Sequence, residues 1–217
     1  MKSALLAVAL FGAAALPLAA QSLEEAGDTR RAGEAAAVRR EIAGDPVAPA
    51  VAPKGADVTL VVFSDYQCPY CRRIHPAIKQ LKREDRRLRI VYRDWPIFGA
   101  LSVEAARTAI AANYQGRHAA FNDALMATQG RIDGAAIRAA AARAGVDWKR
   151  LKADENRHAG EIEGVIARTR GYARAMGLTG TPAMLVGRYL IPGAVDLPTL
   201  RKAIAAARAD NPSRAGP

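Results

Sequence analysis

Cys68 and Cys71 are the only two cysteines among the 217 residues, and two residues separate them. A pair this close can cycle between two thiols and one disulfide, or it can supply ligands to a metal ion. A metal site built on this pair would have too few ligands, because His75 raises the number of protein ligands to three at best. A purely structural disulfide would close a very short loop and stabilise the fold little. Redox chemistry is therefore the leading interpretation.

The residues around the cysteines predict how the pair is positioned. Residues 58–63 (VTLVVF) are typical of a strand buried on both faces, and Pro69 suits the first turn of a helix that follows directly. Cys68 then lies at the helix N-terminus, where free backbone N–H groups and the helix dipole stabilise a thiolate. Arg72 and Arg73 add positive charge nearby. We expect Cys71, one turn further in, to be less exposed, which makes Cys68 the nucleophile and Cys71 the resolving thiol.

The remaining elements follow a recognisable order. Residues 88–92 (LRIVY) predict a second strand, and the strand–helix–strand unit implies a right-handed parallel crossover. From about residue 100 to 176 the apolar residues recur at helical spacing. Strands return at 183–186 (AMLV) and 189–191 (YLI), joined by a tight turn, and Asp196 can cap a last helix. The order β-α-β, helices, β-β-α predicts an α/β fold with an inserted helical domain.

Three segments resemble DsbA-like thioredoxin-fold proteins. They are residues 63–73 (FSDYQCPYCRR), 93–96 (RDWP) and 180–183 (GTPA), and they occur in the family's order. The likeness covers roughly residues 57–208 and implies a thioredoxin fold with a helical insert, and an exported thiol-disulfide oxidoreductase. It further implies a cis Thr181–Pro182 bond that faces the disulfide. The residues expected to contact a substrate peptide are Thr181, Pro182, Pro69 and Tyr70.

Two positions depart from the pattern of that family. Many relatives carry a glutamate six residues before the first cysteine, where this sequence has Val62. A buried carboxylate can accept the proton of the inner thiol, so without it this step relies on water or another group. Asp65 is the nearest acid, but we expect it partly exposed at the end of the strand and assign it no catalytic role. Tyr70 stands where the most oxidising relatives have histidine, so the redox direction stays open.

The two ends of the chain are predicted to lie outside the catalytic domain. Residues 1–20 resemble an export signal, with Lys2, an apolar run and small residues before a cleavage site near Ala20; an uncleaved membrane anchor is the alternative. Residues 21–55 predict a short helix or disorder followed by an extended linker, in which 23–42 could be an oligomerising arm. The domain then covers 56–208, and 209–217 form a flexible tail.

Composition and charge narrow the choice of partners. Half of the residues are apolar and 24% are charged, which predicts a folded domain, and the net charge is +11. The densest basic cluster, 79–89, contains Glu84 and Asp85 and no aromatic residue, so we expect a solvated helix end and no nucleic-acid site. No metal, haem or nucleotide motif occurs, so the Cys68–Cys71 disulfide is the only redox group required.

The expected partners are exported proteins that contain cysteine, together with a membrane redox partner that resets the disulfide. These residues are compatible with two kinds of enzyme. One is an oxidase, and the other is a reductase or isomerase that its membrane partner keeps reduced. A non-catalytic module that binds copper or unfolded client chains is the remaining alternative.

Overall fold

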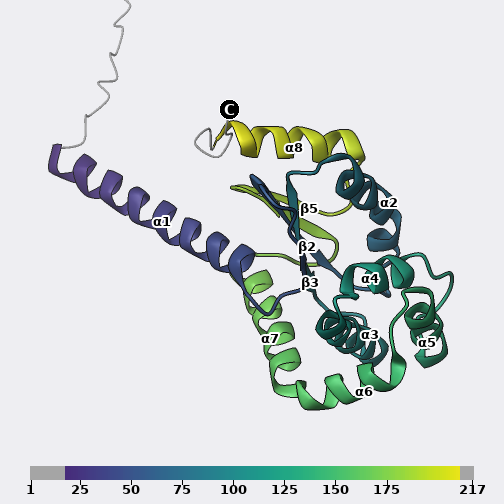
Figure 1. The fold of residues 1–217 in the computed structure, drawn as a ribbon. Helices are drawn as coiled ribbons and strands as arrows, with labels where there is room; N and C mark the ends of the chain where they lie inside the picture. The colour runs from purple at the N-terminus through teal and green to yellow at the C-terminus, as the bar shows by residue number, and fades with distance from the viewer. Residues whose placement is uncertain (1–17, 211–217) are drawn as a thin grey trace, which may run out of the picture. The chain divides into compact units, whose positions relative to one another are not determined.

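The computed structural model describes residues 18–210, and side chains from residue 30 onward. Within that range it is a mixed α/β fold with one five-stranded sheet and eight α-helices (Figure 1). The strands are β1 (Ala50–Val51), β2 (Val58–Ser64), β3 (Leu88–Asp94), β4 (Ala183–Val186) and β5 (Tyr189–Pro192). The helices are α1 (Leu18–Gly44), α2 (Pro69–Glu84), α3 (Ala100–Ala111), α4 (His118–Met126), α5 (Gly134–Arg143), α6 (Trp148–Arg157), α7 (Ala159–Ala175) and α8 (Leu197–Ala209), with a 3-10 turn at Ala112–Gln115.

The sheet has the strand order β1-β3-β2-β4-β5. Strands β2 and β3 are parallel, in register from Val58 opposite Leu88 to Ser64 opposite Asp94, and every other pair is antiparallel. The predicted α/β order of elements is therefore confirmed, and the helices α3 to α7 form the insert. Strand β1 was not predicted, because two residues are too short to show a strand pattern.

Alternate residues of β2 point to the two faces of the sheet and bury both. Leu60 and Val62 belong to a core that includes α2 and α8, whereas Val61 and Phe63 belong to a second core that includes α7. These helices lie on opposite sides of the sheet in Figure 1. Burial on both faces explains why this strand is continuously apolar instead of alternating with polar residues.

A third apolar core lies inside the helical insert and reaches the cysteine pair. Phe121 and Leu125 of α4 are fully buried there, in one cluster with Tyr66, Cys68 and Cys71. The insert thus packs directly against the segment that joins β2 to α2, and it helps to enclose both cysteines.

The chain divides into two compact units, residues 1–37 and 38–217. A single helix, α1, crosses the boundary between them, where the sequence predicts only a short helix or disorder followed by a linker. A helix was considered possible for residues 23–42, but the extended linker expected after it is not seen in residues 43–51, because the end of α1 and strand β1 are packed into the second unit. Ile42 is fully buried in the core that α7 covers, and β1 pairs with β3.

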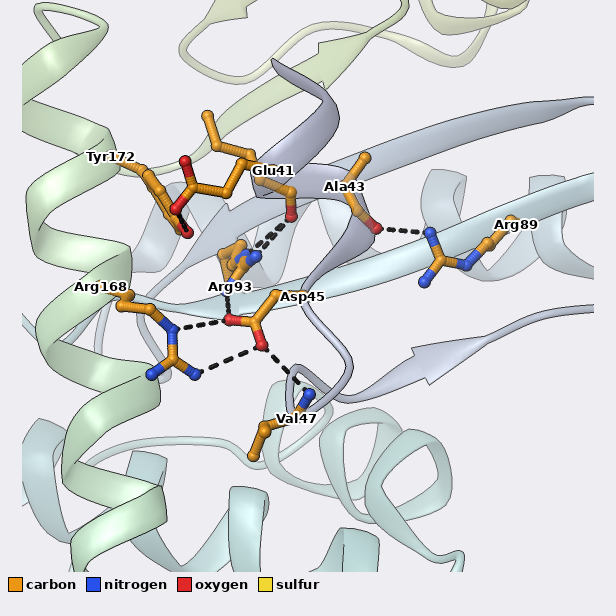
Figure 2. A network of polar contacts seen from close by, with 9 residues as sticks. Glu41, Ala43, Asp45, Val47, Arg89, Arg93, Arg168 and Tyr172 are labelled. Carbon is orange, nitrogen blue, oxygen red and sulfur yellow. Dashed lines mark hydrogen bonds and ion pairs between the residues drawn. The ribbon is translucent and has the colours of Figure 1, made fainter. Parts of the chain in front are cut away.

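A buried polar network holds this segment in place (Figure 2). Asp45 accepts hydrogen bonds from the guanidinium groups of Arg93, at 2.8 Å, and Arg168, at 3.0 and 3.3 Å. Arg93 is fully buried and also donates to the carbonyl oxygen of Ile42, while Tyr172 donates to Glu41 at 2.7 Å. Although burial raises the pKa of Asp45, the bonds from the two arginines lower it to about 2. The segment is therefore held by charge-assisted bonds as well as apolar contacts.

The predicted terminal segments fall largely outside the described residues. Residues 1–17 of the predicted export signal and residues 211–217 of the predicted tail are not described. Within the described part of the chain, no helix has the length and apolar character needed to cross a membrane.

Candidate active site

The two cysteines lie at the junction between strand β2 and helix α2. Cys68 is the N-cap of α2 with an extended backbone conformation, and Pro69 occupies the first helical turn, as predicted. The Cys68 Sγ lies 3.2 Å from the carbonyl oxygen of Thr181, to which the protonated thiol donates. The Thr181–Pro182 peptide bond is cis. The loop before β4 therefore lies directly against the first cysteine, although 113 residues separate the two in sequence.

Both cysteines are free thiols and both are buried, with 1% of Cys68 and 2% of Cys71 exposed. The exposed fraction therefore does not separate the two cysteines, although Cys71 was expected to be the less exposed of them. The reason is that the insert packs over this segment and places both residues in its apolar core. Tyr70, between them, is 53% exposed and forms the outer surface of the site.

The electrostatic environment separates the two sulfur atoms. The Cys71 thiol hydrogen-bonds the Cys68 sulfur, and together with the backbone N–H groups of Cys71 and Tyr70 it lowers the pKa of Cys68 to about 5. The same contact and burial raise the pKa of Cys71 well above that of an ordinary thiol. Near neutral pH Cys68 is therefore a thiolate and Cys71 a protonated thiol. This is the protonation pattern of a nucleophile next to a resolving thiol.

The two arginines after Cys71 contact groups other than the sulfur atoms. Arg72 donates to the carbonyl oxygens of Tyr66, at 2.8 Å, and Gly130, at 2.6 Å, and Arg73 lies over the ring of Tyr70, 4.5 Å from its centroid. Arg72 thus links the loop before α2 to the helical insert.

Asp65 is buried, with 1% exposed, so the expectation that it is partly exposed is wrong. Its Oδ1 accepts hydrogen bonds from the Gln67 N–H and the Ser102 hydroxyl, both at 2.7 Å. Its Oδ2 accepts from the N–H groups of Ile97, at 2.7 Å, and Phe98, at 3.1 Å. The chain after β3 folds back over the end of β2 and covers the carboxylate. Four donors occupy Asp65, so its role is to fix the segment before α3 next to the cysteines.

The structure also brings polar residues into the interior that the sequence did not assign to the site. His75 is buried on α2, one turn after Cys71, and the buried His118 Nε2 lies 3.2 Å from Asp94 Oδ2. The four-residue spacing from Cys71 to His75 was the available sequence signal, since it places both on one face of a helix. In the part of the chain that the structure describes, no cluster of three or more His, Cys, Asp or Glu side chains is arranged to hold a metal ion.

A model of the DSBA-like thioredoxin domain family matches residues 59–205. The chain belongs to this family. Among solved structures, this DsbA-like protein is similar to a thioredoxin-like oxidoreductase from Silicibacter pomeroyi DSS-3, with 38% identity and a TM-score of 0.74 over 79% of this chain and 98% of that chain. It is also similar to the thiol-disulfide exchange protein alpha-DsbA2 from Wolbachia pipientis, with 28% identity and a TM-score of 0.74 over 82% and 97% of the two chains. The predicted thioredoxin fold is thereby confirmed.

Curated relatives of this DsbA-like protein are longer than it is. It is 30% identical over 157 residues to the Na(+)/H(+) antiporter NhaA 1 of Salinispora arenicola, a match that covers 71% of this chain. The chain spans about a quarter, 24%, of the length of that relative.

Proposed function

We propose that this protein is a thiol-disulfide oxidoreductase that exchanges disulfides with exported proteins through Cys68 and Cys71. The observation that carries the proposal is the placement of two free thiols at the start of α2, with Cys68 at the N-cap, where its surroundings lower its pKa. The Cys68 thiolate attacks one sulfur of a disulfide to form a mixed disulfide, and Cys71 then attacks Cys68 to release the second thiol.

The substrate peptide binds beside Cys68 in an extended conformation. Thr181 lies against this cysteine, with its carbonyl oxygen 3.2 Å from the Cys68 Sγ, and Pro182 follows it in the chain. Pro69 and the exposed Tyr70 form the opposite side, so a peptide would add its backbone next to the 181–182 loop. The two cysteines are the only redox group needed, and no dissociable cofactor is part of the proposal.

The lowered pKa of Cys68 favours the direction of an oxidase. A thiolate that is stable in the reduced protein makes the disulfide a stronger oxidant, and nucleophilic cysteines of CxxC sites have pKa values of about 3.5 to 7.5. A membrane redox partner then resets the disulfide. Assembly of several copies through residues 23–42 of α1 would instead favour isomerisation, and comparing the mass of the protein with and without residues 21–37 by light scattering tests this. An unchanged subunit number rejects the assembly.

Disulfide exchange requires a compartment where disulfides form, and the apolar segment at residues 4–15 supports export to one. We therefore infer a periplasmic location after cleavage near Ala20. Fractionation of cells that express the full chain, followed by N-terminal sequencing of the mature protein, tests both points. Recovery of the intact N-terminus in the membrane fraction would favour an anchor.

An equilibrium titration against reduced and oxidised glutathione tests the central proposal. The Cys68–Cys71 disulfide is expected to form and break reversibly, at oxidising buffer ratios if the protein donates disulfides. Cys68→Ser must abolish the exchange, while a module that only binds unfolded client chains would keep that binding in this variant. The absence of a reversible transition would reject the enzyme proposal.

A further inference from the structure

A narrow cavity lies directly beneath the second cysteine. Cys71 lines it together with Val62 of β2, His75 of α2 and Pro182 of the loop that contacts Cys68. The remaining lining residues are Ser64, Ile74, Ile78, Tyr92, Asn122 and Met126. About 10 Å³ of this space is open to the centre of a water molecule, which is close to the room one water needs.

The cavity is the place where a proton acceptor for Cys71 is needed. Cys71 must lose its proton when it attacks the mixed disulfide, and burial and its bond to Cys68 raise its pKa, so this loss is unfavourable. Two residues of β2 line the cavity: the side chain of Val62 has no group that can accept a proton, and Ser64 offers only a neutral hydroxyl. The acidic residue nearest in sequence, Asp65, already accepts hydrogen bonds from four donors.

His75 is the one cavity-lining side chain, besides Cys71 itself, whose type exchanges protons near neutral pH. It follows Cys71 by four residues on α2, so both side chains lie on the same face of the helix. It is 8% exposed, which leaves a narrow route for a proton to leave toward solvent. Tyr92 of β3 also lines the cavity, but burial first and then two nearby carboxylates raise its pKa, so it stays a neutral hydroxyl.

Asp123 of α4 is placed to stabilise a protonated His75. Its Oδ1 lies 3.1 Å from His75 Nε2, and its Oδ2 accepts a hydrogen bond from Lys82 at 2.9 Å. Among the described residues, neither His75 Nε2 nor Asp123 Oδ1 has an aligned hydrogen-bond partner. The ring is therefore next to a negative charge without being locked to it, and a gained proton would be favoured by that charge.

We propose that His75 accepts the proton of Cys71 during the resolving step, directly or through one water in the cavity. The inference rests on the proposed function. As the Cys71 sulfur forms its bond to Cys68, the bond between Cys68 and the substrate sulfur breaks and its electron pair leaves on the substrate sulfur. The Cys71 proton moves to His75, and from there to the leaving thiolate or to solvent.

The reaction with 5,5′-dithiobis(2-nitrobenzoate) separates the two steps in one trace. Attack by Cys68 releases the first coloured thiolate, and attack by Cys71 on the mixed disulfide releases the second. We expect His75→Gln to leave the first phase unchanged and to slow the second about 10²-fold at pH 7, the lower end of what a general base contributes. Added imidazole should restore part of the lost rate, which a purely structural effect would not allow.

The pH profile of the second phase gives an independent readout. The wild-type rate should level off at high pH, as expected when a single group of the protein accepts the Cys71 proton. The His75→Gln rate should keep rising about tenfold per pH unit, because hydroxide then removes this proton. His158→Gln is the matched control, since His158 lies at the exposed α6–α7 junction against Glu161, and it should match wild type in both phases. Equal second phases in wild type and His75→Gln would overturn the inference.

Two further variants keep the test decisive. Asp123→Asn, which removes the charge facing His75 and keeps the ring, should slow the second phase by a smaller factor; an unchanged rate would contradict the role of His75 even if His75→Gln does not fold. If the second phase is slowed in His118→Gln but keeps its wild-type rate in His75→Gln, the proton is accepted by the buried His118–Asp94 pair instead, and the proposed role of His75 is wrong. If wild type released no second thiolate, the proposed function itself would fail.

Discussion

The ionisation of Cys68 is the property from which the chemistry of this protein follows, and its size can be worked out from the structure. The pKa falls from 9.0 for an ordinary thiol to about 5. At pH 7 about 99% of Cys68 is then thiolate, against about 1% without the shift. The difference stabilises the reduced form by roughly 3 kcal/mol, which raises the reduction potential of the disulfide by some tens of millivolts, on the order of 60 mV.

Replacing Cys71 tests the main cause of this shift, because its thiol donates to the Cys68 sulfur. Cys71→Ser keeps a donor at this place, so the pKa of Cys68 should stay near 5. Cys71→Ala removes the donor and should raise the pKa by about 1 to 2 units, as expected for a hydrogen bond to a charged group. Thiolate absorbance at 240 nm and the rate of iodoacetamide alkylation, both followed against pH, measure the two values.

The matched Ser and Ala variants make the reasoning refutable. A wild-type midpoint above about pH 7, or equal midpoints in the two variants, would show that the Cys71 thiol does not stabilise the Cys68 thiolate. Cys68→Ser is the control that must remove the absorbance change.

The same shift predicts how the stability of the reduced protein depends on pH. Because the pKa of Cys68 is lower in the folded than in the unfolded chain, its contribution is fully present above about pH 9 and is lost as the pH falls toward 5. Cys71, whose pKa is raised, acts in the opposite sense only above the ordinary thiol pKa. Urea unfolding of the reduced protein between pH 5 and 8 should therefore show stability rising with pH more steeply than in Cys68→Ser.

Two further predictions concern the buried carboxylates. Asp45→Asn should lower the free energy of unfolding by about 2 kcal/mol at pH 7, because the pKa of Asp45 is lowered from 3.8 to about 2 in the folded protein. The wild-type protein should lose this extra stability as the pH falls through about 2. Equal acid-unfolding curves for the two proteins would contradict this. Asp65→Ala leaves four donors without their acceptor and should cost about 3 kcal/mol or more in urea unfolding. Asp196→Ala, at an exposed helix cap, is the control and should lower the free energy of unfolding less than Asp65→Ala does.

Much of the fold could be read from short stretches of sequence, because those stretches carry their own physical signal. The unbroken apolar run of β2 shows burial on both faces, and Pro69 after Cys68 marks the start of α2. Asp196 caps α8 through the Thr199 N–H at 2.9 Å, as its side-chain type predicts. The position of the cysteine pair at the strand-to-helix junction follows from the same local rules, and so does the expectation of a stabilised thiolate.

Local rules did not predict where distant segments meet. Asp65 was expected to be partly exposed, since nothing near it in sequence shows that Ile97, Phe98 and Ser102 fold back onto its carboxylate. The burial of Cys68 likewise depends on the insert, whose helices supply the other side of its core. Strand β1 pairs with β3 beyond Asp45, which is held by two arginines that lie 48 and 123 residues away in sequence.

The residue types and their order are enough to predict a reactive pair: two thiols, their spacing, and a helix start that favours a thiolate on the first of them. The surroundings of this pair depend on how the whole chain packs. This packing places the 181–182 loop against Cys68 and puts Asp123 of α4 beside His75, next to a cavity under Cys71. The physical reason is that hydrogen-bonding pattern and hydrophobic period are local properties of the chain, whereas burial and the pairing of charges depend on how its elements pack.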